Sequence, residues 1–336
     1  MGQGLLRKRA NLRDVARASG VSVATVSRVL NTPAKVSEAT RRQVQEAIDA
    51  LNFMPNAAAR AINSGRSRKV GALIPTLDNA IFARFLDGLE NRLTEHELAL
   101  IVSTTDDDPV IEAEKARVLV DIGAEGLIIS GVTHSSDLEA LIDRAQVPAV
   151  AISYFDGTYR WPTVGYDNGL GAAMALNHLH DLGHRHIAVL HGPPANNDRT
   201  RARLQTLQLS EFAVELSYFE AGVAIAEGAA LVPRLLKDRR LTALLCLSDV
   251  LAAGALFGLQ RAGRSVPEDL SVIGMEDLAG SASLYPALTT IRLPVFEMGQ
   301  AAADAIAGWV ERGERPAAAL LPVELKIRES TKPVGL

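Results

Sequence analysis

The sequence predicts an α/β protein in which an N-terminal all-α helix-turn-helix domain precedes two doubly wound lobes with parallel sheets. Three observations lead to this fold class. Residues 11–52 contain three short amphipathic helical patterns, with a glycine between the first two. From residue 69 onward, apolar strand patterns alternate with amphipathic helices. About 265 residues of this alternation suit two lobes better than one.

The segment NLRDVARASGVSVATVSRVLN predicts two helices that are interrupted at Gly20. Asn11 and Ser22 are suited to cap the first and second helix, because their side-chain oxygens can accept from free backbone N–H groups. The residues expected to face inward are Leu12, Val15 and Ala16 in the first helix and Val26, Val29 and Leu30 in the second. Two short helices around a tight glycine turn form a helix-turn-helix.

A third helix is predicted in SEATRRQVQEAIDALN, where Ser37 is the expected cap. Its apolar positions at helical spacing are Val44, Ala47, Ile48 and Leu51. The stretch PNAAARAINSGRS then begins at Pro55, is rich in alanine and ends near Gly65. It predicts a short helix that needs a partner for stability.

The remaining chain predicts parallel sheets covered on both faces, because strands and helices alternate as in βαβ units. The expected strands are VGALIP, ELALIVST, EGLIISG, VPAVAIS, RHIAVLHG, ALLCLS and LSVIGM, and the clearest helices are AIFARFLDGLENRL, DPVIEAEKARVLVDIG and NGLGAAMALNHLHDLG. We expect domains at residues 1–54, 55–68 and 69–336. Within the last domain, the N-lobe is expected at about 69–163 and 294–321, and the C-lobe at about 164–293 and 322–336.

Charge is distributed unevenly along the chain. Residues 1–69 contain thirteen Lys and Arg and four Asp and Glu, a net charge of +9, whereas the remaining residues carry −13. This asymmetry predicts a basic module for a polyanion attached to an acidic body. No apolar stretch is long enough for a signal peptide or a membrane span, so we expect a cytoplasmic protein with no membrane partner.

Several other signals do not favour an enzyme or a metal protein. Cys246 lies in an apolar run and is expected to be a buried small hydrophobe. Five of the seven histidines fall between His178 and His191, but no cysteine or carboxylate completes a ligand set. The stretch GLGAAM at 169–174 lacks the third glycine and the strand-turn placement of a dinucleotide fingerprint. We therefore expect no catalytic residues, no metal and no cofactor.

The ordered combination of motifs resembles the LacI/GalR family of bacterial transcription regulators. The matching segments are DVARASGVSVATVSRVLN, PNAAARAINSGRSRKVGALIP, TVGYDNGLGAAMALNHLHDLGHRHIAVLHGP, VPEDLSVIGMEDLAGSASLYPALTTIRLP and LPVELKIREST. The resemblance implies a helix-turn-helix, a hinge helix and a body similar to type I periplasmic sugar-binding proteins. It also implies a homodimer that binds a near-palindromic operator in double-stranded DNA, expected to act as a repressor.

In the helix-turn-helix, Val23, Ala24 and Arg28 are expected to face the major groove. Arg28 can donate a bidentate pair to guanine, whereas Val23 and Ala24 offer apolar contacts, for instance to thymine methyl groups. The residues expected to contact phosphates are Ser22, Thr25, Ser27 and Asn31. The alternative for Arg28 is a solvated surface charge.

The resemblance also implies that the hinge enters the minor groove through Ala57, Ala58 and Ile62. Ile62 stands where the family has a leucine that opens the central base step, and its β-branched side chain is stiffer and shorter in reach. The alternative for this segment is a plain linker.

For the body, the resemblance implies a small polar effector between the lobes, a sugar, a sugar acid or a related metabolite. The expected effector-binding residues are Phe82, Ser130, Asp156, Arg199, Arg203, Ser248 and Glu276. Ser248 and Glu276 replace the family's frequent Asn and Asp, so the ligand is not inherited from the family. The segment NDRTRAR, with Arg199, Arg201 and Arg203, hints at an anionic effector, with surface charge as the alternative. Phe82 could instead be an ordinary core aromatic.

Two rival functions are a solute-binding protein without a transcriptional role and a dinucleotide-dependent oxidoreductase. The first has no use for the basic N-terminal module, and the second needs the missing glycine loop. The function expected from the sequence is therefore an effector-controlled, sequence-specific transcriptional regulator.

Overall fold

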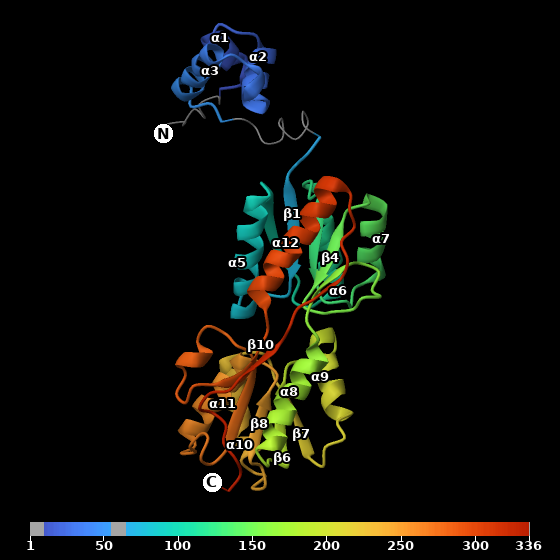
Figure 1. The fold of residues 1–336 in the computed structure, drawn as a ribbon, viewed down its shortest axis with the longest axis vertical. Coiled ribbons are helices and arrows are strands. Elements are labelled where there is room, and N and C mark those ends of the chain that lie inside the picture. The colour runs from blue at the N-terminus through green and yellow to red at the C-terminus, as the bar shows by residue number, and fades with distance from the viewer. Residues whose placement is uncertain (1–9, 55–64, 336) are drawn as a thin grey trace, which may run out of the picture. The chain divides into compact units, whose positions relative to one another are not determined.

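The protein is described by a computed structural model that covers residues 10–54 and 65–335 (Figure 1). Its contacts divide the chain into two compact units, with the boundary between Arg68 and Lys69. The first unit is all-α and the second is α/β, which confirms the predicted fold class. No helix in the described ranges is long and apolar enough to cross a membrane.

The first unit is a helix-turn-helix followed by a third helix. Its elements are α1 (Leu12–Ala18), α2 (Val23–Asn31), the 3-10 helix η1 (Pro33–Lys35) and α3 (Glu38–Ala50). Asn11 caps α1 in a capping box with Asp14, in which each side chain accepts a hydrogen bond from the other residue's backbone N–H. Ser22 and Ser37 cap α2 and α3 as predicted. Gly20 has a φ of +63°, which glycine adopts without strain in the tight turn.

The three helices enclose one small core. Its buried residues are Val15, Ala16, Val26, Val29, Val44, Ala47, Ile48 and Phe53. Leu51 follows the apolar spacing of α3 but is 36% exposed, because the helix ends at Ala50 and the chain turns there. Phe53 fills the core beyond this turn, and its N–H donates to the carbonyl of Ile48.

The second unit contains two six-stranded sheets. The first sheet has the order β11-β5-β4-β3-β1-β2 and the second has the order β12-β10-β9-β8-β6-β7. The strands are β1 (Lys69–Ile74), β2 (Ala99–Thr104), β3 (Gly126–Ser130), β4 (Ala149–Ile152), β5 (Thr163–Gly165), β6 (His186–His191), β7 (Glu215–Glu220), β8 (Ala243–Cys246), β9 (Ser271–Glu276), β10 (Thr289–Arg292), β11 (Ala319–Leu320) and β12 (Glu324–Lys326). All pairings are parallel except that of β10 with β12.

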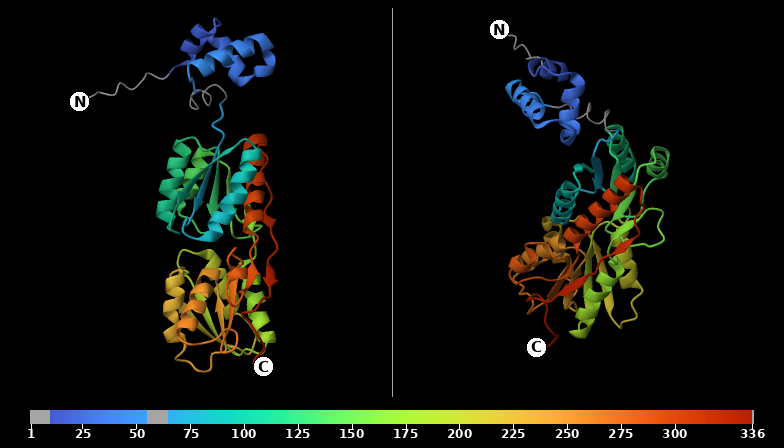
Figure 2. Two further views of the ribbon diagram at one scale, coloured as in Figure 1. Left: turned by 90° about the vertical axis from the view of Figure 1, so that its left-hand side faces the viewer. Right: turned by 45° about the horizontal axis from the view of Figure 1, so that its top comes forward.

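Each sheet forms one lobe with its helices. The helices are α5 (Ala80–Glu95), α6 (Pro109–Asp121), α7 (Ser136–Ala145), α8 (Asn168–Asp181), α9 (Asp198–Gln208), α10 (Ile225–Leu235), α11 (Asp249–Arg261), the 3-10 helix η2 (Ser281–Ser283) and α12 (Val295–Arg312). The chain changes lobes after β5, after β10 and again between β11 and β12. Figure 2 shows the last crossing, where the red C-terminal segment leaves α12 and returns to the second lobe.

Alternate strand residues pack on opposite faces of each sheet. In the first lobe, Ala72 and Ile128 face α5 and α12, whereas Leu73 and Leu127 face α6 and α7. In the second lobe, one sheet face packs on α8 and α9 and the other on α10 and α11. Burial on both faces explains why the strands have nearly continuous apolar sequences.

The predicted histidine cluster holds the C-terminal segment against the second lobe. The His178 ring lies 3.0 Å from the Thr331 hydroxyl, and the His184 ring lies 3.1 Å from the carbonyl of Lys332. Among the described residues, no group of three His, Cys, Asp or Glu side chains is placed to hold a metal ion.

Cys246 is fully buried in β8, and this burial raises the pKa of its thiol.

In the first lobe, helices α5 and α12 approach each other closely at two glycines, one in each helix. A Cβ atom on Gly88 of α5 would lie 2.2 Å from the backbone oxygen of Phe296 in α12, and one on Gly299 would lie 2.3 Å from that of Phe85. Only hydrogen atoms fit at these two positions, so the glycines set the distance between α5 and α12.

Gly88→Ala is therefore expected to lower the free energy of unfolding by roughly 1 to 3 kcal/mol, because the new methyl group forces the two backbones apart. Urea denaturation measures this loss. The matched control is Gly280→Ala, where the added Cβ meets nothing within 4 Å and φ is −82°. A Gly88→Ala protein as stable as this control would contradict the packing argument.

Candidate functional site

The first candidate site is the exposed face of α2. This helix buries Val26 and Val29 in the core of the first unit. On its outer side, Val23 and Ala24 are exposed near the start of the helix, and Arg28 is exposed one turn further on. Positions four apart share a helix face, so Ala24 and Arg28 are presented together. This face offers one guanidinium beside two small apolar side chains, as the sequence predicts.

Three of the four predicted phosphate-contacting residues, Ser22, Thr25 and Ser27, have described side chains and lie at the N-cap or in the first half of α2. Ser22 is exposed, and its hydroxyl lies 2.9 Å from that of Thr25 at the N-terminus of α2. Ser27 is half-buried. The side chain of Asn31 and the predicted hinge residues Ala57, Ala58 and Ile62 lie outside the described residues. The helix N-terminus, with its partial positive charge, is suited to approach a phosphate.

The second candidate site is a cavity of about 140 Å³ between the two lobes. It opens at the carboxyl ends of parallel strands, where ligands bind in doubly wound folds. Its lining residues are Pro75, Thr76, Asn79, Ile81, Phe82, Phe85, Asp107, Ser153, Tyr166, Gly192, Asn197, Arg199, Thr200, Arg203, Val223, Leu247, Ser248, Glu276, Val295 and Met298. Apolar side chains such as Phe82 and Phe85 and polar ones such as Arg203 and Glu276 share this wall, which suits a small polar molecule.

Five of the seven predicted effector-binding residues line this cavity: Phe82, Arg199, Arg203, Ser248 and Glu276. The other two are placed differently. The Ser130 hydroxyl, at the end of β3, accepts a hydrogen bond of 3.3 Å from Arg199 instead of lining the cavity. The Asp156 carboxylate accepts hydrogen bonds from the backbone and hydroxyl of Thr158 in its own turn, which lowers its pKa.

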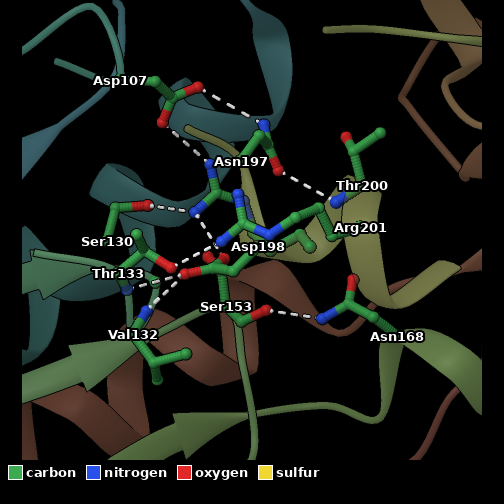
Figure 3. Close-up of polar contacts among 12 residues, drawn as sticks. Asp107, Ser130, Val132, Thr133, Ser153, Asn168, Asn197, Asp198, Thr200 and Arg201 are labelled. Atoms are coloured by element: carbon green, nitrogen blue, oxygen red, sulfur yellow. Dashed lines mark hydrogen bonds and ion pairs between the residues drawn. The ribbon is translucent and has the colours of Figure 1, made fainter. Parts of the chain in front are cut away.

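A polar network at one side of the cavity joins the lobes, and we call the residues Asp107, Val132, Thr133, Asp198 and Arg199 the latch. The buried carboxylate of Asp198, at the start of α9, accepts hydrogen bonds from the backbone N–H groups of Val132 at 2.5 Å and Thr133 at 3.0 Å (Figure 3). Arg199 donates to Asp107 at 3.0 Å and to Asp198 at 3.4 Å. These contacts connect the second lobe to two loops of the first.

Arg201 and Asn197 extend this connection. The Arg201 guanidinium donates to the carbonyls of Pro194 and Ala195 and, across the lobes, to the hydroxyl of Thr133 at 2.6 Å. Asn197 donates to Asp107 at 3.3 Å (Figure 3). The arginines of NDRTRAR are thus not free surface charges, since Arg199 and Arg201 are already occupied by protein acceptors.

Arg203 and Glu276 occupy the part of the cavity formed by the second lobe. Arg203 is 6% exposed and donates to the Asn168 side chain at 3.0 Å and to the carbonyl of Leu247 at 2.9 Å. The Glu276 carboxyl accepts from the hydroxyl of Ser248 at 2.9 Å. Burial raises the pKa of Glu276 to about 8, with a further contribution from Asp249.

Sequence reasoning missed Asn168, which links Arg203 to the crossing between the lobes. Its side-chain oxygen accepts a hydrogen bond from Arg203. Its side-chain nitrogen donates to the carbonyl of Ser153 at 2.9 Å, as Figure 3 shows. Ser153 directly follows β4 and has a φ of +67°, where the chain turns beside the cavity. The N-cap aspartate Asp167 marks the start of α8, but no local pattern shows that the next side chain reaches across to α9.

Sequence reasoning also missed a buried pair behind the latch. The His134 ring lies 2.7 Å from the Glu112 carboxylate and 3.1 Å from the carbonyl of Gly131, and it packs against Trp161. These contacts hold the loop that presents Val132 and Thr133 to Asp198. Glu112 lies in the first turn of α6, where a solvated position is usual, so only the fold reveals its partner.

The fold and the two sites define a regulator with a helix-turn-helix unit and a ligand-binding body. Residues 11–56 match the family model "Bacterial regulatory proteins, lacI family", and residues 176–331 match "Periplasmic binding protein-like domain". The HTH-type transcriptional repressor PurR of Aliivibrio fischeri is 30% identical over 304 residues, which is 88% of this chain and 90% of that protein.

Two solved structures are also similar. The lac repressor dimer bound to operator and the anti-inducer ONPF has a TM-score of 0.87 and 27% identity, over 97% of this chain and 100% of that one. A LacI family regulator of Enterococcus faecium with bound ribose has a TM-score of 0.70 and 27% identity, over 79% of this chain and 99% of that one.

The chain therefore belongs to the LacI family of bacterial regulatory proteins. It is a transcriptional regulator and not an enzyme, which confirms the function expected from the sequence. The alternative of a solute-binding protein without a transcriptional role does not account for the helix-turn-helix unit.

Proposed function

We propose that this protein represses transcription in the cytoplasm by binding a near-palindromic operator as a homodimer, and that a small polar effector between its lobes changes the affinity for DNA. The observation that carries the proposal is the occurrence in one chain of an exposed α2 face with Arg28 and of a polar cavity between two lobes. The first site suits DNA and the second suits a small molecule.

A dimer follows from the size of the DNA-reading surface. One helix-turn-helix module has too little surface for tight specific binding, and two modules match the two halves of a palindrome. The operator-bound lac repressor is a dimer, which supports the same assembly for this chain. The proposed DNA contacts are Val23, Ala24 and Arg28 in the major groove, Ser22, Thr25, Ser27 and Asn31 at phosphates, and Ala57, Ala58 and Ile62 in the minor groove.

The proposed effector is a sugar, a sugar acid or a related metabolite. The bound ribose in the Enterococcus faecium regulator supports this class, as do the hydroxyl and amide groups that line the cavity. Control requires only that the effector bind more tightly to one of two states that differ in DNA affinity. The latch gives the observed arrangement of the lobes a set of contacts that an effector can strengthen or break.

Fluorescence anisotropy tests the DNA-binding half of the proposal. The full-length protein is titrated onto a labelled palindromic operator selected from a random library, and onto a scrambled duplex of equal length. We expect the operator to bind at least a thousandfold more tightly, with affinity falling steeply as salt rises because phosphate contacts release counterions. Equal affinity for the two duplexes would contradict the proposal.

A further inference from the structure

Arg203 is a buried cation that has no anionic partner in the described part of the chain. Its two acceptors, the Asn168 side chain and the Leu247 carbonyl, are both neutral. A guanidinium has five N–H groups, so several remain for another acceptor. Within residues 10–54 and 65–335, no carboxylate forms an ion pair with Arg203. A buried charge that lacks a counterion is costly, which makes this position favourable for an anion.

The neighbouring arginines do not offer the same opportunity. Arg199 also lines the cavity, but its charge is offset by Asp107 and Asp198 in the latch. Arg201 donates to carbonyl and hydroxyl oxygens and does not line the cavity. Among the three arginines of NDRTRAR, Arg203 alone presents an uncompensated charge to the cavity.

Glu276 is the acidic group that could offset Arg203 from within the cavity. The charged and titratable groups that face it are Arg203 from α9, Asp249 from α11 and Tyr166 after β5. Burial, followed by the charge of Asp249, raises its pKa to about 8, despite the opposing effect of Arg203. Glu276 is therefore mainly protonated at neutral pH and does not cancel the charge of Arg203.

We infer that the effector is a monoanion whose carboxylate binds the guanidinium of Arg203, which makes it a sugar acid or a similar polyhydroxy acid. This inference rests on the proposed function and narrows its ligand class. A guanidinium and a carboxylate match as a planar, bidentate pair. A single uncompensated positive charge balances a carboxylate better than a phosphate dianion, which Asp107 in the cavity wall would also repel. The hydroxyl and amide groups of Asn79, Thr200 and Ser248 remain for the ligand hydroxyls.

Isothermal titration calorimetry of the full-length protein with matched probes tests the inference. The pairs are gluconate with glucitol, galactonate with galactitol, and glucuronate with glucose, with glucose 6-phosphate as the phosphate probe. We expect at least one acid to bind ten times more tightly than its neutral partner. Arg203→Gln should remove this preference, whereas the control Arg240→Gln, at an exposed arginine of the same lobe that does not line the cavity, should retain it.

A pH series provides a second readout that does not depend on Arg203→Gln being folded. As the pH rises from 7 through about 8 to 9, Glu276 ionises and its charge offsets Arg203. The affinity of the wild-type protein for the acid should therefore fall several-fold over this range. Glu276→Gln carries no titrating carboxyl, so its affinity should stay constant.

The possible outcomes separate this inference from the proposed function. A neutral sugar or the phosphate probe binding more tightly than every acid would overturn the inference, and so would a panel in which no acid binds. An acid preference that survives Arg203→Gln, with wild-type affinity independent of pH, would also overturn it. In each case sequence-specific binding of the operator by the same protein would leave the proposed function intact.

Discussion

Arg28→Ala is expected to remove discrimination at one base pair in each half-site of the operator. Arg28 is exposed on α2, beside the small side chains of Val23 and Ala24, which can only make apolar contacts. A bidentate pair between arginine and guanine contributes roughly 1 to 3 kcal/mol of discrimination per half-site. Because a dimer uses two half-sites, the preference for operator over an operator mutated at both positions should fall by roughly 2 to 6 kcal/mol. Competition anisotropy with a set of single-base operator variants measures this loss.

The control for this prediction is Arg42→Ala. The Arg42 side chain is 84% exposed and forms an ion pair of 3.5 Å with Glu46 within α3, not α2. Its removal should leave the ranking of operator variants unchanged. If Arg28→Ala instead weakened binding to every duplex by the same factor, and reduced the salt dependence by about one ion per half-site, Arg28 would contact a phosphate.

Asp198→Ala is expected to have the largest effect on the body of the protein. The substitution leaves the N–H groups of Val132 and Thr133 without their acceptor and removes one of the two carboxylates beside Arg199. Breaking a buried ion pair by removing one partner costs about 3 to 5 kcal/mol. Urea denaturation should show a loss of this size, and hydrogen exchange at the amides of Val132 and Thr133 should accelerate.

The matched control for the latch is Asp137→Ala. Asp137 also lies in the first turn of a helix, α7, so it interacts with the helix dipole in the same way, but its side chain is exposed. Its loss should cost less than about 1 kcal/mol. The prediction is contradicted if Asp198→Ala and Asp137→Ala lower the free energy of unfolding equally and hydrogen exchange at the amides of Val132 and Thr133 is unchanged. The latch would then not stabilise the observed arrangement of the lobes.

The helix-turn-helix could be predicted almost completely from the sequence because its signals are local. Asn11, Ser22 and Ser37 each bond to backbone groups two or three residues away, so the caps are visible in the sequence itself. The seven predicted strands of the body are present because long apolar runs favour buried parallel strands. Five strands were not predicted. Four of them, β5, β10, β11 and β12, have two to four residues each and are defined by pairing with a distant segment. The fifth, β7, is an edge strand whose sequence ELSYFE has no apolar run and no fully buried residue.

The candidate effector site was predicted in part. Motif positions indicated Phe82, Arg203, Ser248 and Glu276, which line the cavity. The wall also contains Asn79 and Tyr166, which no sequence signal indicated. Asn79 caps α5, a local role that the sequence could have shown, but the cavity wall is assembled from loops of both lobes. Such convergence depends on three-dimensional packing and leaves no trace in local spacing.

The sequence by itself determined that an α/β body follows a basic helix-turn-helix. It also determined that Arg28 is the main polar residue on the exposed face of that module. Both could be predicted because periodicity, caps and charge are local properties. Only the tertiary structure decided what each arginine of NDRTRAR does. The sequence motifs placed Arg199 and Arg203 among the effector-binding residues, and all three arginines hinted at an anionic effector. In the structure, however, Arg199 pairs with Asp107, 92 positions earlier, and Arg201 reaches Thr133. Among the residues that the structure describes, no carboxylate pairs with the buried Arg203. The physical reason is that a buried charge is controlled by its neighbours in space, and the fold selects these neighbours from distant parts of the chain.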